Sequence, residues 1–293
     1  MPAVSKALVL GGKSGLLGKA LVETLLEAGW DVEVGGVTRD TNLSEVNMSE
    51  EFAALMERTD PAVVFNTIAY TQVDVAEDNE ENATLLNRTY PAIVSRVVKE
   101  HGSRLVHYST DFVFDGKKNV PYTEIDKPNP TSVYGRTKLE GEEAILDTGL
   151  EKATIIRTAW LFGSGKKNFI STILNLCKER ESLNVVHDQI GSPTYTLDLA
   201  QHSLSLVEAE ANGLFHLVNS GVASWCDFAG EAARLAGVPC AIHPITSAEY
   251  PQKAIRPAYS VLDTNRFTQI TGITPRPWAQ ALRDYIYKDY LIG

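Results

Sequence analysis

The chain has 293 residues, a formal net charge of −10 at pH 7 and 44% hydrophobic residues. This length is ample for one large core or for two closely packed domains. The excess of acidic residues argues against partners such as nucleic acid or an anionic membrane surface. Because no apolar run is long enough to span a bilayer, and the first residues lack the pattern of a signal peptide, we expect a cytoplasmic protein.

Strand and helix patterns alternate through the first half of the chain. In chain order, we expect a strand at 7–10, a helix at 16–28, a strand at 31–37, a short helix at 49–57, a strand at 62–66, a long helix at 79–99 bent near Pro91, a strand at 104–109, a helix at 131–146 and a strand at 153–157. Such alternation predicts a parallel sheet with helices on both faces. Right-handed connections then give a doubly wound, Rossmann-like α/β fold.

The alternation loosens after residue 157. Helical patterns recur at 168–180, 196–210, 224–236 and 277–290, a strand pattern lies at 213–218, and residues 242–276 are rich in proline and turn residues. No flexible linker separates the two halves. We therefore expect a nucleotide-binding domain over residues 1–157. Residues 158–293 should form mainly a smaller C-terminal substrate-binding cap, with segments crossing back to the first domain and a ligand cleft between the two.

A glycine-rich stretch joins the first strand to the first helix. Its spacing, Gly12-x-x-Gly15-x-x-Gly18, is a wider variant of the GxGxxG dinucleotide fingerprint. Glycines let the backbone turn tightly and approach a pyrophosphate, and free N–H groups at the helix start face the anion. Glycines also cluster in ordinary turns, but the position after the first strand favours nucleotide binding. A P-loop is excluded because Ala7 stands where that motif needs its first glycine.

A second group of residues combines a strand end with a helix start. Thr110 ends a strand, and ligands bind beyond the carboxyl ends of parallel strands. Tyr134 and Lys138 stand at i and i+4 of a helix and so share a face. We expect the Lys138 ammonium group to lower the pKa of the Tyr134 phenol, so that the tyrosine exchanges a proton near neutral pH. An ordinary helix-surface pair would also explain this spacing, but the coincidence with the strand end and the glycine turn favours catalysis.

These segments together resemble the dTDP-4-dehydrorhamnose reductase family of the extended short-chain dehydrogenase/reductase superfamily. The matching segments are 12–18, 66–77, 107–116, 133–142, 157–160, 188–194, 216–218 and 256–257. The resemblance implies NAD(P)H-dependent reduction of the C4 keto group of dTDP-4-dehydro-6-deoxy-L-mannose to dTDP-L-rhamnose. It further implies that Tyr134 protonates the developing alkoxide, Lys138 holds the cofactor ribose and Thr110 polarises the keto oxygen.

The motifs and the resemblance give two larger sets of site residues. The cofactor-binding residues that we expect are Gly12, Gly15, Leu16, Leu17, Gly18, Arg39, Asn47, Ala69, Tyr70, Thr71, Tyr134 and Lys138. The substrate-binding residues that we expect are Thr110, Asp111, Tyr134, Trp160, Gln189 and Arg256. Arg256 suits the diphosphate of a nucleotide sugar, although a surface salt bridge would also account for it.

The residues that follow the second predicted strand partly indicate which cofactor is preferred. An acidic residue there favours NAD, whereas an arginine favours NADP. Since Arg39 precedes Asp40, we expect NADPH, with NADH also usable, although Arg39 could instead be a solvated loop residue. Asn47 stands where the family often has an aspartate near the adenine, and its amide can still bond to the base.

No metal is expected, and the partner is a nucleotide sugar. Some members of the family bridge a dimer through magnesium and a glutamate of the first helix, where this chain has Lys19 and Ala20. The three cysteines and six histidines show no ligand spacing. The chain is expected to be a monomer or a homodimer.

Other functions remain open at this point. The chain could reduce another nucleotide-linked 4-keto sugar. A dehydratase is disfavoured, because Phe112 rather than an acid follows Asp111. A non-catalytic NADP-binding regulatory subunit would tolerate the loss of Thr110, Tyr134 and Lys138, and their retention argues against it.

Overall fold

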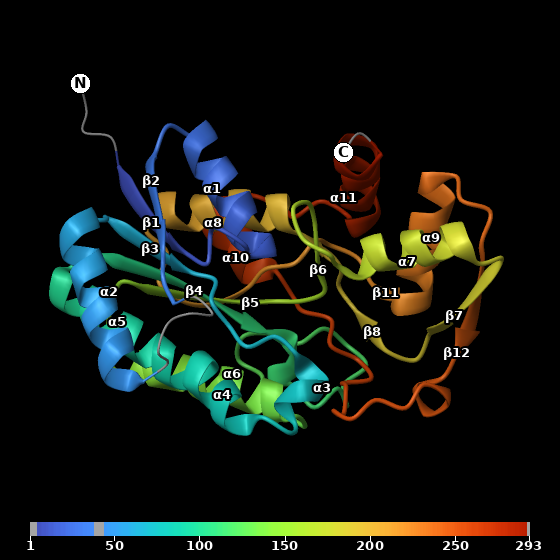
Figure 1. Cartoon of the computed structure of the whole chain (residues 1–293), viewed down its shortest axis with the longest axis horizontal. Helices are drawn as coiled ribbons and strands as arrows, with labels where there is room; N and C mark the ends of the chain where they lie inside the picture. Colours follow the sequence, from blue (N-terminus) through green and yellow to red (C-terminus); the bar gives the residue numbers. More distant parts are fainter. Residues whose placement is uncertain (1–4, 38–43, 292–293) are drawn as a thin grey trace.

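The computed structural model describes residues 5–37 and 44–291, and its larger part is built on a six-stranded sheet (Figure 1). All strand pairings in this sheet are parallel, in the order β10-β5-β4-β3-β1-β2. The strands are β1 (Lys6–Leu10), β2 (Asp31–Gly35), β3 (Val63–Asn66), β4 (Arg104–Thr110), β5 (Ala153–Thr158) and β10 (Gly213–His216). The predicted parallel sheet is therefore confirmed.

Helices cover both faces of this sheet, because successive side chains of each strand point to opposite faces. Within β1, Ala7 and Val9 belong to one apolar core, and Leu8 and Leu10 belong to another. The first core packs against α1 (Leu16–Glu27), α8 (Thr196–Glu208) and α10 (Asn265–Thr271), and the second against α2 (Glu45–Thr59), α5 (Tyr90–His101) and α6 (Val133–Asp147). The doubly wound α/β class that the alternation predicts is thus confirmed.

A smaller lobe, at the right of Figure 1, forms from the C-terminal half. Its helices are α7 (Phe169–Glu179), α9 (Trp225–Ala236) and α11 (Trp278–Asp284). Its paired strands are β6 (Leu161–Phe162) with β9 (Thr194–Tyr195), β7 (Ser182–Val186) with β12 (Ala241–Ile245), and β8 (Ile190–Gly191) with β11 (Ala223–Ser224). Although α8, β10 and α10 follow residue 157, they pack within the layers of the large sheet.

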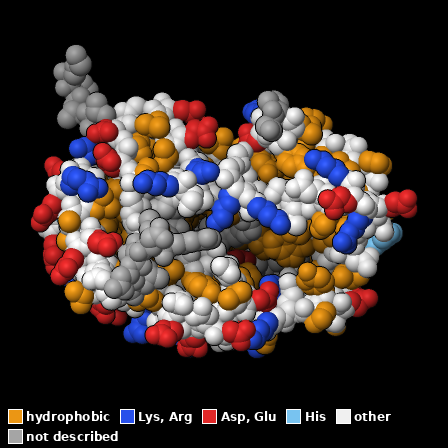
Figure 2. Space-filling model, viewed as in Figure 1, with side chains coloured by type: hydrophobic (Ala, Val, Ile, Leu, Met, Phe, Trp, Pro, Cys, Tyr) orange, Lys and Arg blue, Asp and Glu red, His pale blue; other side chains and the backbone are white. Residues whose placement is uncertain are grey.

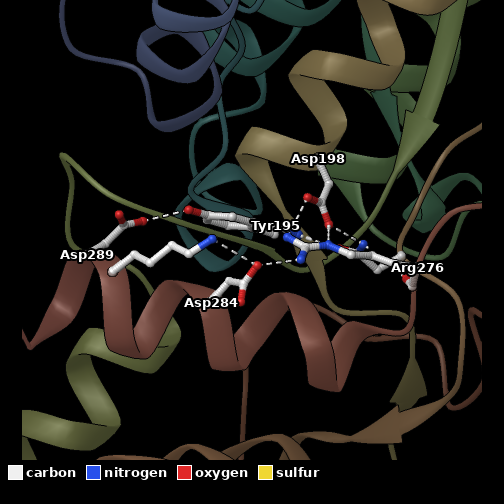
Figure 3. Close-up of polar contacts among 7 residues, drawn as sticks. Tyr195, Asp198, Arg276, Asp284 and Asp289 are labelled. Atoms are coloured by element: carbon white, nitrogen blue, oxygen red, sulfur yellow. Dashed lines mark hydrogen bonds and ion pairs between the residues drawn. The ribbon is translucent and has the colours of Figure 1, made fainter.

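Ion pairs attach the C-terminal helix to α8 (Figure 3). The guanidinium group of Arg276 donates to Asp198 from Nε at 2.8 Å and from Nη2 at 2.7 Å. Its Nη1 donates to Asp284 of α11 at 2.6 Å, and the Tyr195 hydroxyl donates to Asp289 at 2.6 Å. Since Asp198 is buried, Arg276 supplies the opposite charge that a buried carboxylate needs.

Several predicted elements differ in detail from those observed. The helix predicted at 79–99 is interrupted by a π-helical turn, η1 (Leu85–Thr89), between α4 (Glu80–Thr84) and α5. Pro91 lacks an N–H group for the preceding turn, which explains irregularity at this place. The helix predicted at 49–57 begins earlier, because Ser44 caps it by accepting a hydrogen bond from the Asn47 N–H at 3.2 Å.

Short elements escape the prediction altogether. They are α3 (Val73–Ala76), the 3₁₀ turns η2 (Asp111–Val113) and η3 (Ser247–Glu249), the short strands of the smaller lobe, and α10. The helix predicted at 277–290 is observed as α11 followed by the π-helical turn η4 (Tyr285–Tyr290). Of the helices that the structure describes, none has the length and apolar composition needed to cross a membrane.

Candidate functional site

The glycine turn lies at the carboxyl end of β1, as predicted. Gly11, which follows β1 directly, has a φ of +85°, a conformation that favours glycine. A Cβ atom on Gly15 would lie 2.8 Å from the Gly11 carbonyl oxygen, and one on Gly18 would lie 2.5 Å from it. The first turn of α1 therefore packs directly on the loop backbone, which only residues without a side chain allow.

This turn has the properties of a phosphate site. Gly15 is the N-cap of α1 and the first turn of the helix carries no acidic residue. No described residue accepts a hydrogen bond from the N–H group of Leu16 or Leu17. Free donors at the positive end of a helix dipole attract an anion. The residues present thus fit the pyrophosphate of a dinucleotide.

The loop after β3 lies at the same edge of the sheet. Ala69, Tyr70 and Thr71, all predicted to contact the cofactor, lie in this loop. Asn87 of η1 holds it, accepting from the Tyr70 N–H at 2.8 Å and donating to the Tyr70 carbonyl at 3.2 Å. The same Asn87 amide donates to the Thr137 hydroxyl of α6 at 3.0 Å. Asn87 therefore fixes the predicted cofactor loop relative to the helix that carries Tyr134.

The residues that follow the second strand add little to the described cofactor site. Arg39, on which the NADPH expectation depends, lies outside the described residues. Asn47 lies in the first turn of α2 and is partly buried.

Tyr134 stands at the start of α6, where two side chains fix the backbone. The Ser132 hydroxyl accepts from the Gly135 N–H at 3.1 Å, and a Glu77 carboxylate oxygen accepts from the Val133 N–H at 2.9 Å. The ring of Tyr134 meets Phe112 edge to face, with the ring centroids 5.6 Å apart. These contacts hold the phenol near the end of β4.

The electrostatics of Tyr134 differ from the expectation. Burial raises the pKa of Tyr134 to about 12, an effect that the negative charge of Asp111 reinforces and the Thr110 hydroxyl partly offsets. The predicted lowering by Lys138 is wrong for this structure, since the Lys138 ammonium group donates to the Tyr108 carbonyl at 2.6 Å. A phenol with a raised pKa keeps its proton at neutral pH and can donate it to a strong base such as an alkoxide.

Lys138 is almost completely buried. Burial lowers the pKa of Lys138 to about 8, although the charge of Glu142 opposes the shift. The Glu142 carboxylate is itself bound by Arg157, with Nε and Nη2 donating at 2.9 and 2.6 Å, and by the Ser109 hydroxyl. The lysine therefore lacks a carboxylate partner of its own, and the lowered pKa brings its loss of charge to about pH 8.

Thr110 and Asp111 lie where β4 passes into η2. The Thr110 hydroxyl donates to Asp111 at 3.1 Å, and the Ser260 hydroxyl donates to the other carboxylate oxygen of Asp111 at 2.6 Å. Burial raises the pKa of Asp111 to about 6 despite these hydrogen bonds. Thr110, Asp111 and Ser260 therefore form one buried hydrogen-bonded group, and Tyr134 lies close enough for Thr110 and Asp111 to influence its pKa.

A cavity of about 730 Å³ opens beside this group, and Figure 2 shows an apolar hollow between the two lobes. Trp160, Gln189 and Arg256, all predicted to bind substrate, line the cavity. Thr110, Asp111 and Tyr134 do not line it themselves, but Phe112 and Ser260, which contact them, do. The six predicted substrate residues thus lie in or next to one cavity.

Trp160 takes an unusual backbone conformation, with a φ of +49°. Its indole stacks on Trp225 with the ring centroids 3.6 Å apart. A Cβ atom on Gly191 would lie 2.6 Å from this indole, so the ring also packs closely on the backbone there. Strained backbone conformations cluster at ligand sites, and Trp160 lines the cavity.

Arg256 is engaged in an ion pair between the two lobes. Its Nη1 and Nη2 donate to the two carboxylate oxygens of Asp74 in α3 at 3.0 and 2.7 Å. This hydrogen bonding lowers the pKa of Asp74 to about 2. The salt bridge that we weighed as an alternative is therefore present, and binding of a diphosphate stays a prediction.

Several residues at the site were not predicted. Asn87, Trp225 and Ser260 belong to no motif of the sequence, and His107 lies in a matching segment but was assigned no role. Their partners are distant in the chain, as with Asn87 and Thr137, which are 50 positions apart. Gly11 could have been found as the neighbour of Gly12. Within residues 5–37 and 44–291, no group of three or more His, Cys, Asp or Glu side chains is arranged to hold a metal ion.

Comparisons with known proteins agree with this geometry. The family model described as the RmlD substrate binding domain matches residues 6–291. The chain is 39% identical to the spore coat polysaccharide biosynthesis protein SpsK of Bacillus subtilis, with 97% of each chain covered. It is 38% identical to the dTDP-4-keto-6-deoxy-D-glucose reductase of Streptomyces niveus, covering 92% of this chain and 93% of the relative. The dTDP-4-dehydrorhamnose reductase of Bacillus anthracis, solved in complex with NADP, superposes with a TM-score of 0.91 at 31% identity, covering 98% of this chain and all of that one.

Proposed function

The chain belongs to the RmlD substrate binding domain family, and on this premise we propose that it is an NAD(P)H-dependent reductase of a nucleotide-linked 4-keto sugar. Its substrate is dTDP-4-dehydro-6-deoxy-L-mannose and its product dTDP-L-rhamnose. The family expected from the sequence motifs is thereby confirmed. The product would serve polysaccharide biosynthesis, the process named for the Bacillus subtilis relative.

One observation carries the proposal: a protonated, partly buried phenol stands between a phosphate-type glycine turn and a large cavity. When bound, the nicotinamide supplies the hydride. Tyr134 then protonates the substrate oxygen, because the raised pKa of the phenol keeps its proton available. Thr110 orients that oxygen, and Lys138, one helical turn after Tyr134, restores the proton and has donors for the ribose.

The same proposal assigns the cofactor contacts, the sugar contacts and the roles of the two parts of the chain. The glycine turn with Leu16 and Leu17, the loop 69–71 and Asn47 hold the cofactor, and Asp111, Trp160, Gln189 and Arg256 hold the nucleotide sugar. Residues 158–293 supply mainly the substrate-binding part, and residues 1–157 mainly the cofactor-binding part. The protein acts in the cytoplasm as a monomer or a homodimer.

A second substrate is favoured by a specific observation. The Streptomyces niveus relative, named for a D-glucose-derived 4-keto sugar, is as similar to this chain as the reductases named for the rhamnose precursor. Reduction of another dTDP-4-keto-6-deoxy sugar is therefore the alternative. The same proton donor serves both substrates, and the cavity contacts to the sugar ring decide between them.

The test mixes the protein with NADPH and each 4-keto sugar and follows the absorbance of the reduced cofactor. We expect turnover on the L-lyxo-configured sugar, its loss in Tyr134→Phe and its retention in Tyr287→Phe, a control at a half-exposed tyrosine remote from the site. NADPH binding without turnover on any 4-keto sugar would instead favour the regulatory subunit.

Cofactor choice has its own test. We propose NADPH as the preferred cofactor, with NADH usable. Arg39→Asp should shift the preference toward NADH, because an acid repels the 2′-phosphate and accepts from a ribose hydroxyl. An unchanged ratio of the two activities would remove Arg39 from the proposal.

A further inference from the structure

A buried histidine that the proposed reaction does not use contacts the lysine that it does use. His107 of β4 has no exposed surface, and its Nε2 lies 3.5 Å from the Nζ atom of Lys138. Its Nδ1 lies 3.2 Å from the Nδ2 atom of Asn66, which is also buried. The three side chains form a row that runs from the end of β3, through β4, to α6.

The row fixes where His107 carries its proton. The side-chain amide oxygen of Asn66, Oδ1, accepts from the Ile68 N–H at 3.2 Å, so the side-chain amide nitrogen of Asn66 must face the imidazole. An amide nitrogen only donates, and Nδ1 must therefore accept. Burial and the charge of Lys138 hold the pKa of His107 well below its usual value, so the ring is neutral and its single proton is on Nε2.

The Nε2–H group thus points at the Lys138 nitrogen. Against an ammonium group this is a contact of two donors, whereas an uncharged amine offers a lone pair that accepts the hydrogen bond. The other groups near Lys138 do not donate a hydrogen bond to its nitrogen. The Tyr108 carbonyl accepts from Nζ, Tyr134 shares its face of α6, and Glu142 is bound by Arg157 of β5. His107 is the neighbour that favours the uncharged lysine.

We propose that His107 is a positioning residue for the proposed reduction: its Nε2–H group stabilises the uncharged form of Lys138, and so lets this lysine give up and regain the proton that replenishes Tyr134. Tyr134 loses its hydroxyl proton to the substrate oxygen and takes one from the Lys138 ammonium group. The amine left behind accepts the Nε2–H hydrogen bond and regains a proton from solvent. His107 neither gains nor loses a proton. This inference rests on the proposed function.

The tautomer can be measured without turnover. In the full chain labelled with ¹⁵N-histidine, we expect the His107 signals to show a bare Nδ1 and a protonated Nε2 that does not titrate between about pH 8 and about pH 5. His216, the other fully buried histidine among the described residues, serves to assign the spectrum through His216→Gln. A proton on Nδ1, or titration near the ordinary pKa, would overturn the inference.

The pH profile tests the consequence. Activity should fall as pH rises through the pKa of Lys138, about 8, because the ammonium form is the proton source. In His107→Gln the amide oxygen can accept from the ammonium group, so the alkaline fall should move up by roughly one pH unit, with little change in KM for NADPH. His216→Gln, a control for the loss of a buried imidazole, should leave the fall in place. An unmoved profile in an active His107→Gln refutes the role. Absence of turnover on every 4-keto sugar refutes the proposed function instead, and the NMR result distinguishes the two failures.

Discussion

Removing Glu142 should be one of the most damaging single changes in this protein. Glu142 of α6 and Arg157 of β5 are 3% and 2% exposed, and two guanidinium nitrogens bind the carboxylate. The Ser109 hydroxyl of β4 donates to the same carboxylate. The pair therefore joins one helix to two central strands, immediately behind the end of β4 where the candidate site lies.

The size of the effect follows from what the variant leaves behind. In Glu142→Leu, the buried Arg157 keeps its charge and loses its partner, and its Nη1 already has no hydrogen-bond partner among the described atoms. Removing one member of a buried ion pair typically costs about 3–5 kcal/mol. We expect a loss of this size in the free energy of unfolding, since a well-paired salt bridge becomes an unpaired buried cation.

Urea unfolding at pH 7 followed by circular dichroism measures this loss. Glu140→Leu is the matched control, because Glu140 lies on the same helix and pairs with the partly exposed Arg136, a contact that contributes about 0.2–1 kcal/mol. The double variant Glu142→Leu/Arg157→Met should recover most of the loss, since it removes both charges. A loss in Glu142→Leu no larger than in Glu140→Leu would refute the reasoning.

Three further predictions concern the turn, the lobes and the helix of Tyr134. Gly18→Ala should weaken NADPH binding at least about tenfold and destabilise the fold by about 1–3 kcal/mol in urea unfolding, because its Cβ would lie 2.5 Å from the Gly11 oxygen. Gly230→Ala is the control: its Cβ meets nothing within 4 Å, so it should stabilise α9 by about 0.5–1 kcal/mol in the same unfolding assay. Asp74→Asn should lower Tm at pH 6 but not near pH 2. The pKa of Asp74 is lowered from 3.8 to about 2, so the stabilisation from its ion pair is present above pH 3.8 and is lost as pH falls through 2. An equal difference in Tm at both pH values would contradict this. Ser132→Ala should cost about 1 kcal/mol through loss of the cap on α6, as urea unfolding would show, whereas an unchanged midpoint would mean that Glu77 caps the helix alone.

The large sheet could be predicted from local patterns, because its inner strands β1, β3, β4 and β5 are buried on both faces and read as short apolar runs such as 7–10. The helices between them have periodic apolar faces and clear ends. The smaller lobe could not be predicted in this way. Its strands are two to five residues long, as in β6 and β12, and they pair across long sequence separations that no local pattern encodes.

In the candidate site, too, local features could be predicted from the sequence and long-range features could not. The positions of Gly15, Gly18, Tyr134 and Lys138 follow from a turn and from helical spacing, which are local properties. Their electrostatics do not. The phenol of Tyr134 has a raised rather than a lowered pKa because burial outweighs the other influences on it, and burial depends on how the whole chain packs. The contact between His107 and Lys138 likewise depends on the register of β4 beneath α6.

The short helix α3 shows how the two lobes share one site. Asp74 binds Arg256 and accepts from the Ala254 N–H at 3.0 Å, and Asp78 pairs with Lys253, so the segment that carries Arg256 is held by the first lobe. Glu77, between these two acids, accepts from the first N–H group of α6. A displacement of the segment that carries Arg256 should therefore act on the same few residues that fix the start of the helix carrying Tyr134. Under the proposed function, a guanidinium group that turns toward a diphosphate must leave Asp74. We therefore expect substrate binding to act on residues 74–77, and through Glu77 on the start of α6.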